Sequence, residues 1–417
     1  MINEEQIKDI VLYKGADMKM TETLLNFIRD HAEDDLSTLL LSASRYKDID
    51  IKMAVGQIKA RSRIKDKLPS WYNRDRLLFP STLATEQCSS EITALYKQRF
   101  IQRGDCICDL TGGLGVDSYF FSQKAKSVIY VEKDKDYCEA ARYNMGILGA
   151  SGISVINAEA TEVITNNDSR ISEANIFYID PDRRGKGNKR MFAIADCEPD
   201  LTKIWPHILE KQCKIIVKLS PMLDITQVLT QLTGVSEVHV ISVRNECKEL
   251  IVVSYNKNPD TQIFCINYTS DGEEQLFRFI FQDEHSATVR PAAKVGRYLY
   301  EPNSSILKAG AYKSVACHFG VEKLHVSSHL YTSNNLISSF PGRIFEATEI
   351  IPFGSRTCKT LSTEIPKANI SVRNFPLSAE EFRKRTQITD GGNVYLFATT
   401  MSENSKILIK CRKILRK

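Results

Sequence analysis

A glycine-rich turn between an apolar strand and a helix constrains this chain more than any other feature. The sequence over 107–117 reads I-C-D-L-T-G-G-L-G-V-D, and S-Y-F-F-S follows it as the start of a helix. Glycine is needed where the backbone passes close under a nucleotide, because a Cβ atom would occupy the space of the ligand. The segment therefore predicts a strand, a ligand-binding turn and a helix in that order.

The acid that ends this strand, Asp109, indicates which ligand the turn would hold. A dinucleotide site offers backbone N–H groups at a helix N-terminus to a pyrophosphate. S-adenosylmethionine carries no phosphate, and its ammonium and sulfonium groups favour a carboxylate nearby. The pattern D-x-x-x-G-x-G, from Asp109 to Gly115, thus favours a methyl donor over a nicotinamide.

Further short apolar strands follow, and acidic residues stand at or just after their ends. Strands are predicted over 127–132, 153–156, 175–179 and 214–219, helices over 137–148 and about 198–212, and a closing hairpin over 237–243 and 249–255. This alternation predicts a Rossmann-like α/β domain whose parallel sheet binds its ligand at the carboxyl ends of the strands. Glu132 is placed to bind ribose hydroxyls, and Glu159 to receive the adenine amino group.

Residues 80–255 resemble class I S-adenosylmethionine-dependent methyltransferases, on the D-L-T-G-G-L-G turn, Glu132 and the loop D-P-D-R-R over 180–184. The segment 86–97 is similar to the short helix that precedes the core of trimethylguanosine-synthase-type enzymes and other RNA guanine-N2 methyltransferases. R-N-F-P-L over 373–377, with 391–400, resembles the THUMP-like domain of one bacterial group of these enzymes. The resemblance implies that the cofactor-binding residues are Gln87, Thr93, Asp109, Thr111, Gly113, Gly115, Asp117, Glu132, Lys133, Ala158, Glu159, Ala160 and Asp180.

Four parts are predicted along the chain. They are an N-terminal helical region (1–79), the S-adenosylmethionine-dependent methyltransferase domain (80–258), a small α+β ferredoxin-like module (259–335) and the THUMP-like domain (336–417). Turn-forming residues mark the boundary near 256–260. Beyond it we expect strands over 261–269 and 275–282 around the turn Asp271-Gly272, a helix over 307–319 and a last strand over 406–410.

Composition excludes several classes of protein. No apolar run approaches the length of a membrane span, and the acidic start of the chain does not read as a signal peptide. The 11 cysteines include no C-x-x-C pair, and the histidines do not stand in metal-ligand spacing, so buried thiols of a cytoplasmic enzyme without a metal are expected.

The net charge of +5 is small, but basic residues gather over 59–76, 183–190 and 406–417. Each run alone reads as a solvated face; together, with one beside the predicted active site, they favour RNA as a partner.

The loop after the fourth strand carries the predicted chemistry. Enzymes that methylate exocyclic amines of bases often place [D/N]-P-P-[aromatic] there; this chain has Asp180, Pro181, Asp182 and Arg183. Asp180 and the carbonyl of Pro181 would accept hydrogen bonds from the amine, and the plane of Arg183 or Arg184 would stack on the base. Alternatively, Asp182 only fixes the loop through an ion pair with Arg184.

The acceptor class follows from this loop and from the resemblance. The segment K-L-S-P over 218–221 has no cysteine for attack on a pyrimidine ring. A purine exocyclic amine in structured tRNA or rRNA is therefore the leading acceptor, with guanine N2 ahead of adenine. Two alternatives stay open: a methyltransferase that acts on a protein or small molecule, and an RNA-binding protein that has lost catalysis. The intact Asp109, Gly113, Gly115, Glu132 and Asp180 argue against the second.

Overall fold

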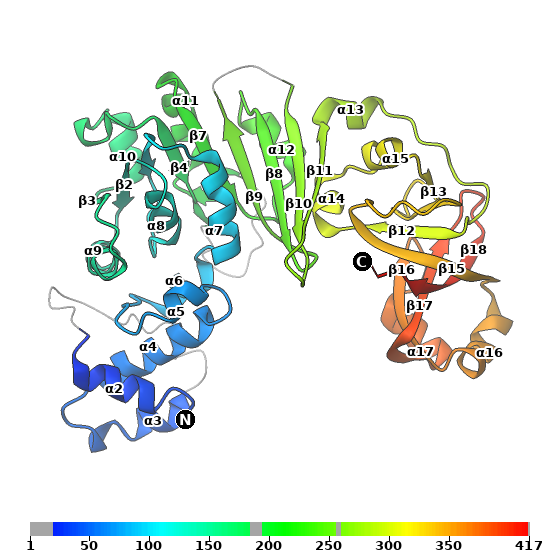
Figure 1. Ribbon diagram of the computed structural model, residues 1–417, viewed down its shortest axis with the longest axis horizontal. Coiled ribbons are helices and arrows are strands. Elements are labelled where there is room, and N and C mark those ends of the chain that lie inside the picture. The colour runs from blue at the N-terminus through cyan, green and yellow to red at the C-terminus, as the bar shows by residue number, and fades with distance from the viewer. Residues whose placement is uncertain (1–19, 184–193, 256–259, 416–417) are drawn as a thin grey trace. The chain divides into compact units, whose positions relative to one another are not determined.

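The computed structural model describes residues 20–183, 194–255 and 260–415, and the chain divides into two compact units. The first unit comprises residues 1–219, 226–234 and 253–257, and the second comprises 220–225, 235–252 and 258–417. Figure 1 shows the elements of both units along the chain. Each unit has its own clusters of buried hydrophobic residues.

The first unit begins with short helices. They are α2 (Glu22–Asp30), α3 (Leu36–Leu41), η1 (Ala43–Arg45), α4 (Ile51–Ile64), α5 (Pro69–Tyr72), α6 (Thr82–Gln87), α7 (Glu91–Lys97) and η2 (Gln98–Phe100). Capping side chains such as Asp50 and Ser81 accept hydrogen bonds from backbone N–H groups of the first turn, which would otherwise lack partners. The predicted N-terminal helical region is confirmed.

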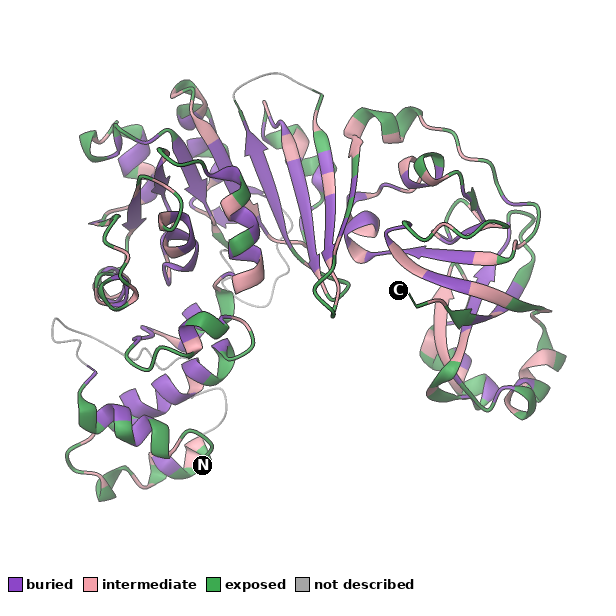
Figure 2. Cartoon of the chain, in the orientation of Figure 1, coloured by how far each residue is buried: buried purple, intermediate pink, exposed green. Residues whose placement is uncertain are grey.

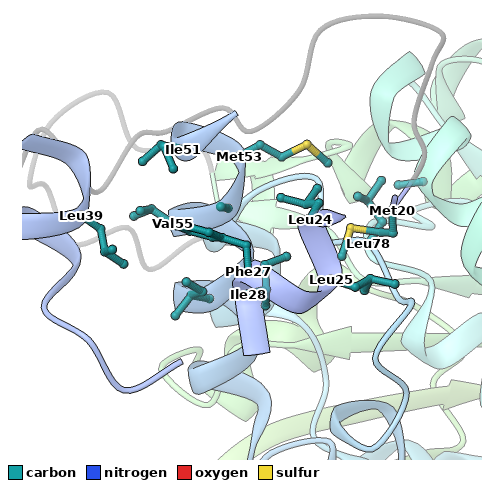
Figure 3. Close-up of a cluster of buried hydrophobic side chains, with 13 residues drawn as sticks. Met20, Leu24, Leu25, Phe27, Ile28, Leu39, Ile51, Met53, Val55 and Leu78 are labelled. Carbon is teal, nitrogen blue, oxygen red and sulfur yellow. The ribbon is translucent and has the colours of Figure 1, made fainter. Parts of the chain in front are cut away.

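Apolar residues at helical spacing hold these helices together. Leu24, Phe27 and Ile28 of α2 pack with Val55 of α4 in one buried cluster, which Figure 3 shows. The cluster also includes Ala140 of α9 (Lys135–Leu148), so the helices pack on the domain that follows them in the chain.

A parallel sheet forms the centre of the first unit. Its strands are β1 (Cys106–Asp109), β2 (Ser127–Glu132), β3 (Ile153–Asn157), β4 (Ile176–Ile179) and β7 (Lys214–Leu219), in the order β7-β4-β1-β2-β3. The first unit also contains α8 (Val116–Ser122), α9, α10 (Ala160–Thr165), η3 (Ser169–Ile171), η4 (Ile194–Asp196), α11 (Leu201–Glu210), α12 (Ile225–Gln231) and the hairpin of β5 (Asp182–Arg183) and β6 (Cys197–Glu198).

Strands β1 and β4 are buried along their whole length. Figure 2 colours buried residues purple, and the strand β4 is purple there. Strands covered on both faces read as continuous apolar runs, and this is why the sequence located them. Because all five strands are parallel, their carboxyl ends meet at one edge of the sheet. The predicted α/β class with a Rossmann-like sheet is confirmed.

The second unit contains two groups of strands. The first is ordered β11-β10-β8-β9 and comprises β8 (Glu237–Val243), β9 (Glu246–Ser254), β10 (Gln262–Tyr268) and β11 (Glu274–Ile280). The second is ordered β13-β14-β12-β15-β18-β17-β16 and comprises β12 (Tyr298–Pro302), β13 (Glu322–Lys323), β14 (Tyr331–Ser333), β15 (Gly342–Pro352), β16 (Lys367–Arg373), β17 (Thr389–Thr400) and β18 (Lys406–Lys413). Helices α13 (Phe281–Ser286), α14 (Ser304–Ala309), α15 (Ser314–Phe319), α16 (Ser355–Glu364) and α17 (Ala379–Thr386) complete the unit.

One buried carboxylate connects three strands of the 7-stranded sheet. Glu301 of β12 is 3% exposed. It accepts from Nε of Arg343 in β15 at 2.6 Å and from Nη2 of Arg373 in β16 at 2.8 Å. A buried carboxylate is tolerated because both of its oxygens are paired with cations.

Two details of the second unit differ from the sequence prediction. The single helix expected over 307–319 is two helices, α14 and α15, because the chain turns at Gly310, whose φ is +70°. The predicted hairpin around Asp271-Gly272 is present as β10 and β11, but β10 pairs in parallel with β8. These strands therefore extend the group of β8 and β9. The predicted boundary at 256–260 lies mostly outside the described residues.

Candidate functional site

The glycine turn after β1 is shaped by its neighbours in the sheet. A Cβ atom at Gly112 would lie 2.2 Å from the ring of Tyr130, and Gly115 has a φ of +84°. The hydroxyl of Tyr130 donates to the carbonyl of Gly113 at 2.6 Å. A Cβ atom at Gly113, by contrast, would have only the carbonyl oxygen of Thr111 within 4 Å, at 3.8 Å. The turn is thus fixed on its inner side and open beside Gly113, as a site that receives a ligand requires.

Asp109, the acid before the turn, lies inside the protein. It is 1% exposed, and its oxygens accept from the backbone N–H of Thr111 at 3.1 Å and from the Ser118 hydroxyl at 2.6 Å. Burial raises the pKa of Asp109 to about 7, although these two hydrogen bonds act in the opposite direction. Its observed contacts shape the turn, and its direct contact with the cofactor stays a prediction.

Glu132, at the end of β2, stands beside the same turn. Its Oε2 accepts from the backbone N–H of Gly113 at 3.0 Å, and its Oε1 accepts from that of Asp134 at 2.9 Å. Burial raises the pKa of this carboxyl above its ordinary value. Each carboxylate oxygen can accept a further hydrogen bond, so Glu132 is still able to bind a ribose hydroxyl.

Residues at the end of β3 lie next to Glu132. The backbone N–H of Ala158 donates to the carbonyl of Glu132 at 3.1 Å. Glu159 precedes α10 and is half-buried, and Ala160 begins that helix and is buried. This is where the adenine contact was expected, since these residues follow β3 at the same edge as Glu132.

Lys133 lies at the same edge but pairs with the hairpin that follows β4. Its Nζ forms an ion pair with Glu198 of β6 at 2.5 Å. Glu198 stands opposite Asp182 in the hairpin of β5 and β6. Lys133 therefore connects the end of β2 to the loop in which the acceptor chemistry was predicted.

Asp117 belongs to a buried network. Its oxygens receive Nζ of Lys97 at 2.9 Å, the Ser89 hydroxyl at 2.7 Å and the Tyr178 hydroxyl at 2.7 Å. Burial opposes ionisation of Asp117, yet the charges of Lys97 and Lys218 hold its pKa below the ordinary value. Both oxygens face partners within the protein, and the cofactor contact expected for Asp117 stays a prediction.

The segment 86–97, expected to contact the cofactor, is anchored by the same network. Lys97 is 0% exposed and also donates to the Ser89 hydroxyl at 2.7 Å. Thr93 is buried; its backbone N–H donates to the side chain of Ser90, which caps α7, and its own hydroxyl donates to the carbonyl of Ser90 at 3.1 Å. Gln87, at the end of α6, is exposed.

The loop after β4 is bonded to the glycine turn and to β7. The backbone N–H of Asp180 donates to the Thr111 hydroxyl at 2.7 Å, and the Asp180 Oδ2 atom forms an ion pair with Nζ of Lys218. Pro181 is half-buried and Asp182 is exposed. Only the strand pairing of Arg183 with Cys197 is described. Arg184 and the basic residues up to Arg190 lie outside the described residues, so the proposed Asp182–Arg184 pair stays a prediction.

Sequence reasoning missed Lys97 and Lys218. Each follows an apolar stretch, and a lysine in that position normally indicates the point where a strand or helix returns to the surface. The available signal was the pattern I-I-V-K-L, in which a charge stands within a strand that is otherwise buried.

The basic stretch 59–76 differs from its expected role. Arg61 is buried, and its guanidinium donates to the carbonyl of Leu77 at 2.9 Å and lies over the ring of Phe79. Arg63 is exposed and pairs with Glu86 at 2.9 Å. A run of basic residues does not reveal which of them point inward, and the RNA contact expected for the stretch 59–76 stays a prediction for its exposed members.

Over 20–183, 194–255 and 260–415, no three His, Cys, Asp or Glu residues gather in a way that could hold a metal ion. None of the described helices combines the length and the apolar character of a membrane-spanning segment.

Comparisons with known proteins agree with this architecture. Residues 298–341 match a family model for a ferredoxin-like domain, and residues 342–413 match one for a THUMP-like domain. A curated protein of Thermotoga maritima, named "Uncharacterized RNA methyltransferase", is 26% identical over 133 residues, which are 31% of this chain. The match spans only 30% of that relative.

A solved structure matches almost the whole chain. It is described as "putative methyltransferase from Porphyromonas gingivalis W83", is 37% identical, and has a TM-score of 0.84 over 95% of this chain and 100% of its own. The protein therefore belongs, with that relative, to a bacterial family of class I methyltransferases that carry ferredoxin-like and THUMP-like domains at the C-terminal side of the catalytic domain.

Proposed function

We propose that the protein transfers the methyl group of S-adenosylmethionine to a purine exocyclic amine in structured RNA, with guanine N2 the first candidate. The observation that carries the proposal is the position of Asp180. Its backbone is bonded to the glycine turn through Thr111, and its carboxylate is 31% exposed. A hydrogen-bond acceptor is thus held at the edge of the sheet where the cofactor turn lies.

The residues around the turn suit this cofactor. The open space beside Gly113 admits a ligand, and Glu132 offers acceptors to hydroxyl groups. Glu132, Ala158 and Glu159 would hold the ribose and the adenine, and the turn from Thr111 to Gly115 would hold the methionine part. When bound, S-adenosylmethionine supplies an electrophilic methyl group on a sulfonium. The chain itself has to orient the acceptor and accept its proton.

RNA as the substrate class is supported by the Thermotoga maritima relative, which is named an RNA methyltransferase, and by the THUMP-like domain. Basic side chains that are exposed on β18, Arg412 and Lys413, suit a phosphate backbone. Guanine N2 is proposed from the loop that begins with Asp180 and Pro181, whose acceptors match an amine.

The test is transfer of a labelled methyl group. Purified protein is incubated with methyl-labelled S-adenosylmethionine and total RNA from a strain that lacks the gene, and the RNA is digested for nucleoside mass spectrometry. N2-methylguanosine should rise with the intact protein and not with Asp180→Ala. A methylated adenosine in place of N2-methylguanosine would support RNA as the substrate but would show that the target base is adenine. If the labelled methyl group survives nuclease treatment and is found in protein or in small molecules, the RNA assignment is refuted.

A further inference from the structure

Lys218 and Asp180 are neighbours because of the register between two strands. In the parallel pair of β4 and β7, Ile179 stands opposite Val217. The next residue of each strand is Asp180 and Lys218, so both side chains leave the sheet at its carboxyl edge on the same side. The ion pair between Nζ of Lys218 and Oδ2 of Asp180 follows directly from this register.

The two oxygens of Asp180 have different surroundings. Oδ2 is bonded to Lys218, whose side chain is only 13% exposed. Among the residues that the structure describes, Oδ1 makes no hydrogen bond to the protein. The backbone N–H of Asp180 is fixed on Thr111 at 2.7 Å. The backbone N–H and Oδ2 of Asp180 are therefore both held by partners in the protein, and Oδ1 is left for a ligand.

Other lysines in this region have partners of their own. Lys67 donates to the carbonyl oxygens of Thr85 at 3.1 Å and Glu86 at 2.6 Å, at the end of α6. Lys97 is paired with Asp117 at 2.9 Å. Neither of these contacts involves Asp180, whereas Lys218 donates to its Oδ2.

We propose that Lys218 is a positioning residue for methyl transfer: it holds one oxygen of Asp180 so that the other faces the reacting amine. The inference rests on the proposed function of Asp180 as the acceptor. During transfer the nitrogen lone pair forms the N–CH3 bond, and the C–S bonding pair returns to sulfur, which becomes the thioether of S-adenosylhomocysteine. The proton released by the methylated nitrogen passes to Asp180 and then to water.

The charge of Lys218 suits this task as well as its position does. The ammonium group of Lys218 donates a charge-assisted hydrogen bond to Oδ2, and such a bond holds a carboxylate more firmly than a neutral donor does. An exocyclic amine needs a fixed acceptor during the displacement and not a strong base. Without Lys218 the carboxylate is free to rotate, and the loss of a fixed approach geometry costs up to about 100-fold in rate.

The experiment is a double-mutant cycle with methyl transfer to the same RNA as readout. Lys218→Met should lower kcat about 10- to 100-fold, with the KM for RNA and the affinity for S-adenosylhomocysteine within about twofold of wild type. Lys218→Arg, which keeps a charged donor, should recover most of the rate. In an Asp180→Ala background, Lys218→Met should cost less than about twofold, because the group through which it acts is gone. Lys211→Met, whose partner is the exposed Asn167, is the matched control and should keep the wild-type rate.

Two results would overturn the inference: additive losses in the cycle, or loss of cofactor affinity equal to the loss of rate. If the wild-type protein transfers no methyl group to RNA, the proposed function fails, and Lys218 is then tested by structure. Crystals of wild type and Lys218→Met with S-adenosylhomocysteine should show the Asp180 carboxylate ordered in the first and turned away in the second. The same orientation in both would refute the role of Lys218.

Discussion

The hydroxyl of Thr111 accepts the backbone N–H of Asp180 at 2.7 Å, and so the turn after β1 and the loop after β4 share one hydrogen bond. The two segments are 69 residues apart in the chain. Thr111→Val keeps the shape of the side chain but leaves the N–H without its partner. Such a loss costs about 1–3 kcal/mol for a fully buried donor, and less here because the bond is partly buried. We expect a lower melting temperature and slower methyl transfer. Thr111→Ser should retain both properties, and a Val variant as active as Ser would show that the bond is dispensable.

Asp180 should matter more than its neighbour Asp182. Asp180→Ala removes the proposed acceptor and should reduce methyl transfer about 100-fold or more, within the range of a positioned proton acceptor. Affinity for S-adenosylhomocysteine, measured by calorimetry, should not change. Asp182→Ala should cost less, because Asp182 is exposed and stands in the hairpin with Glu198. A fully active Asp180→Ala enzyme would remove the amine mechanism.

The buried pair of Lys97 and Asp117 should dominate the stability of the first unit. Lys97→Met leaves a buried carboxylate without its cation and should cost about 3–5 kcal/mol in the free energy of unfolding. Lys97→Met with Asp117→Leu should be less destabilised than Lys97→Met alone. As a control, Arg29→Ala breaks the exposed pair with Asp75 and should cost less than about 1 kcal/mol. Equal losses in the two single variants, by urea unfolding, would contradict this account.

Asp109 should make stability fall as the pH rises from about 4 to 7. Burial raises its pKa in the folded protein to about 7, from an ordinary value of 3.8. The folded state therefore binds more protons than the unfolded state in this window, and unfolding becomes easier as the pH rises. The full effect is at most about 4 kcal/mol. Comparing wild type with Asp109→Asn by urea unfolding at several pH values isolates this residue, and a difference that is constant with pH would exclude it.

Exposed basic residues of β18 should contribute to RNA affinity through phosphate contacts. Charge reversal at Arg412 and Lys413 should weaken binding to total RNA and reduce the salt dependence of the affinity by about one unit of slope for each lost contact. Arg63→Glu serves as a comparison, because its partner Glu86 already balances that charge. Insensitivity of binding both to salt and to the β18 reversals would show that this strand is only a solvated surface.

The parallel sheet could be predicted almost residue by residue, whereas the side-chain partners could not. Strands β2 and β7 have the predicted bounds because apolar β-branched runs flanked by polar residues leave little choice of register or length. The helix expected over 307–319 was interrupted by Gly310, which takes a left-handed conformation. Both a continued helix and a helix end are compatible with glycine in a sequence, and packing decides between them.

In the site, the sequence located Asp109, Glu132 and Asp180 but did not reveal what each one contacts. Lys97 and Asp117 meet across α7 and α8, and Lys218 meets Asp180 through the pairing of β7 and β4. Such contacts depend on which strands are adjacent, and charge alone does not encode that. Arg61 shows the same limit, since a basic run contains both buried and exposed members.

The carboxylate of Glu301 bears on how the C-terminal part can be divided. Glu301 lies in the segment that matches the ferredoxin-like model, whereas Arg343 and Arg373 lie in the segment that matches the THUMP-like model. A cut at 341/342 would leave a buried negative charge on one fragment and two unbalanced guanidinium groups on the other, and would also separate β12 from β15. The border between two sequence families is therefore not a border between two independently folding pieces. Two separate family models match this part of the chain, but their segments should unfold together as one cooperative unit.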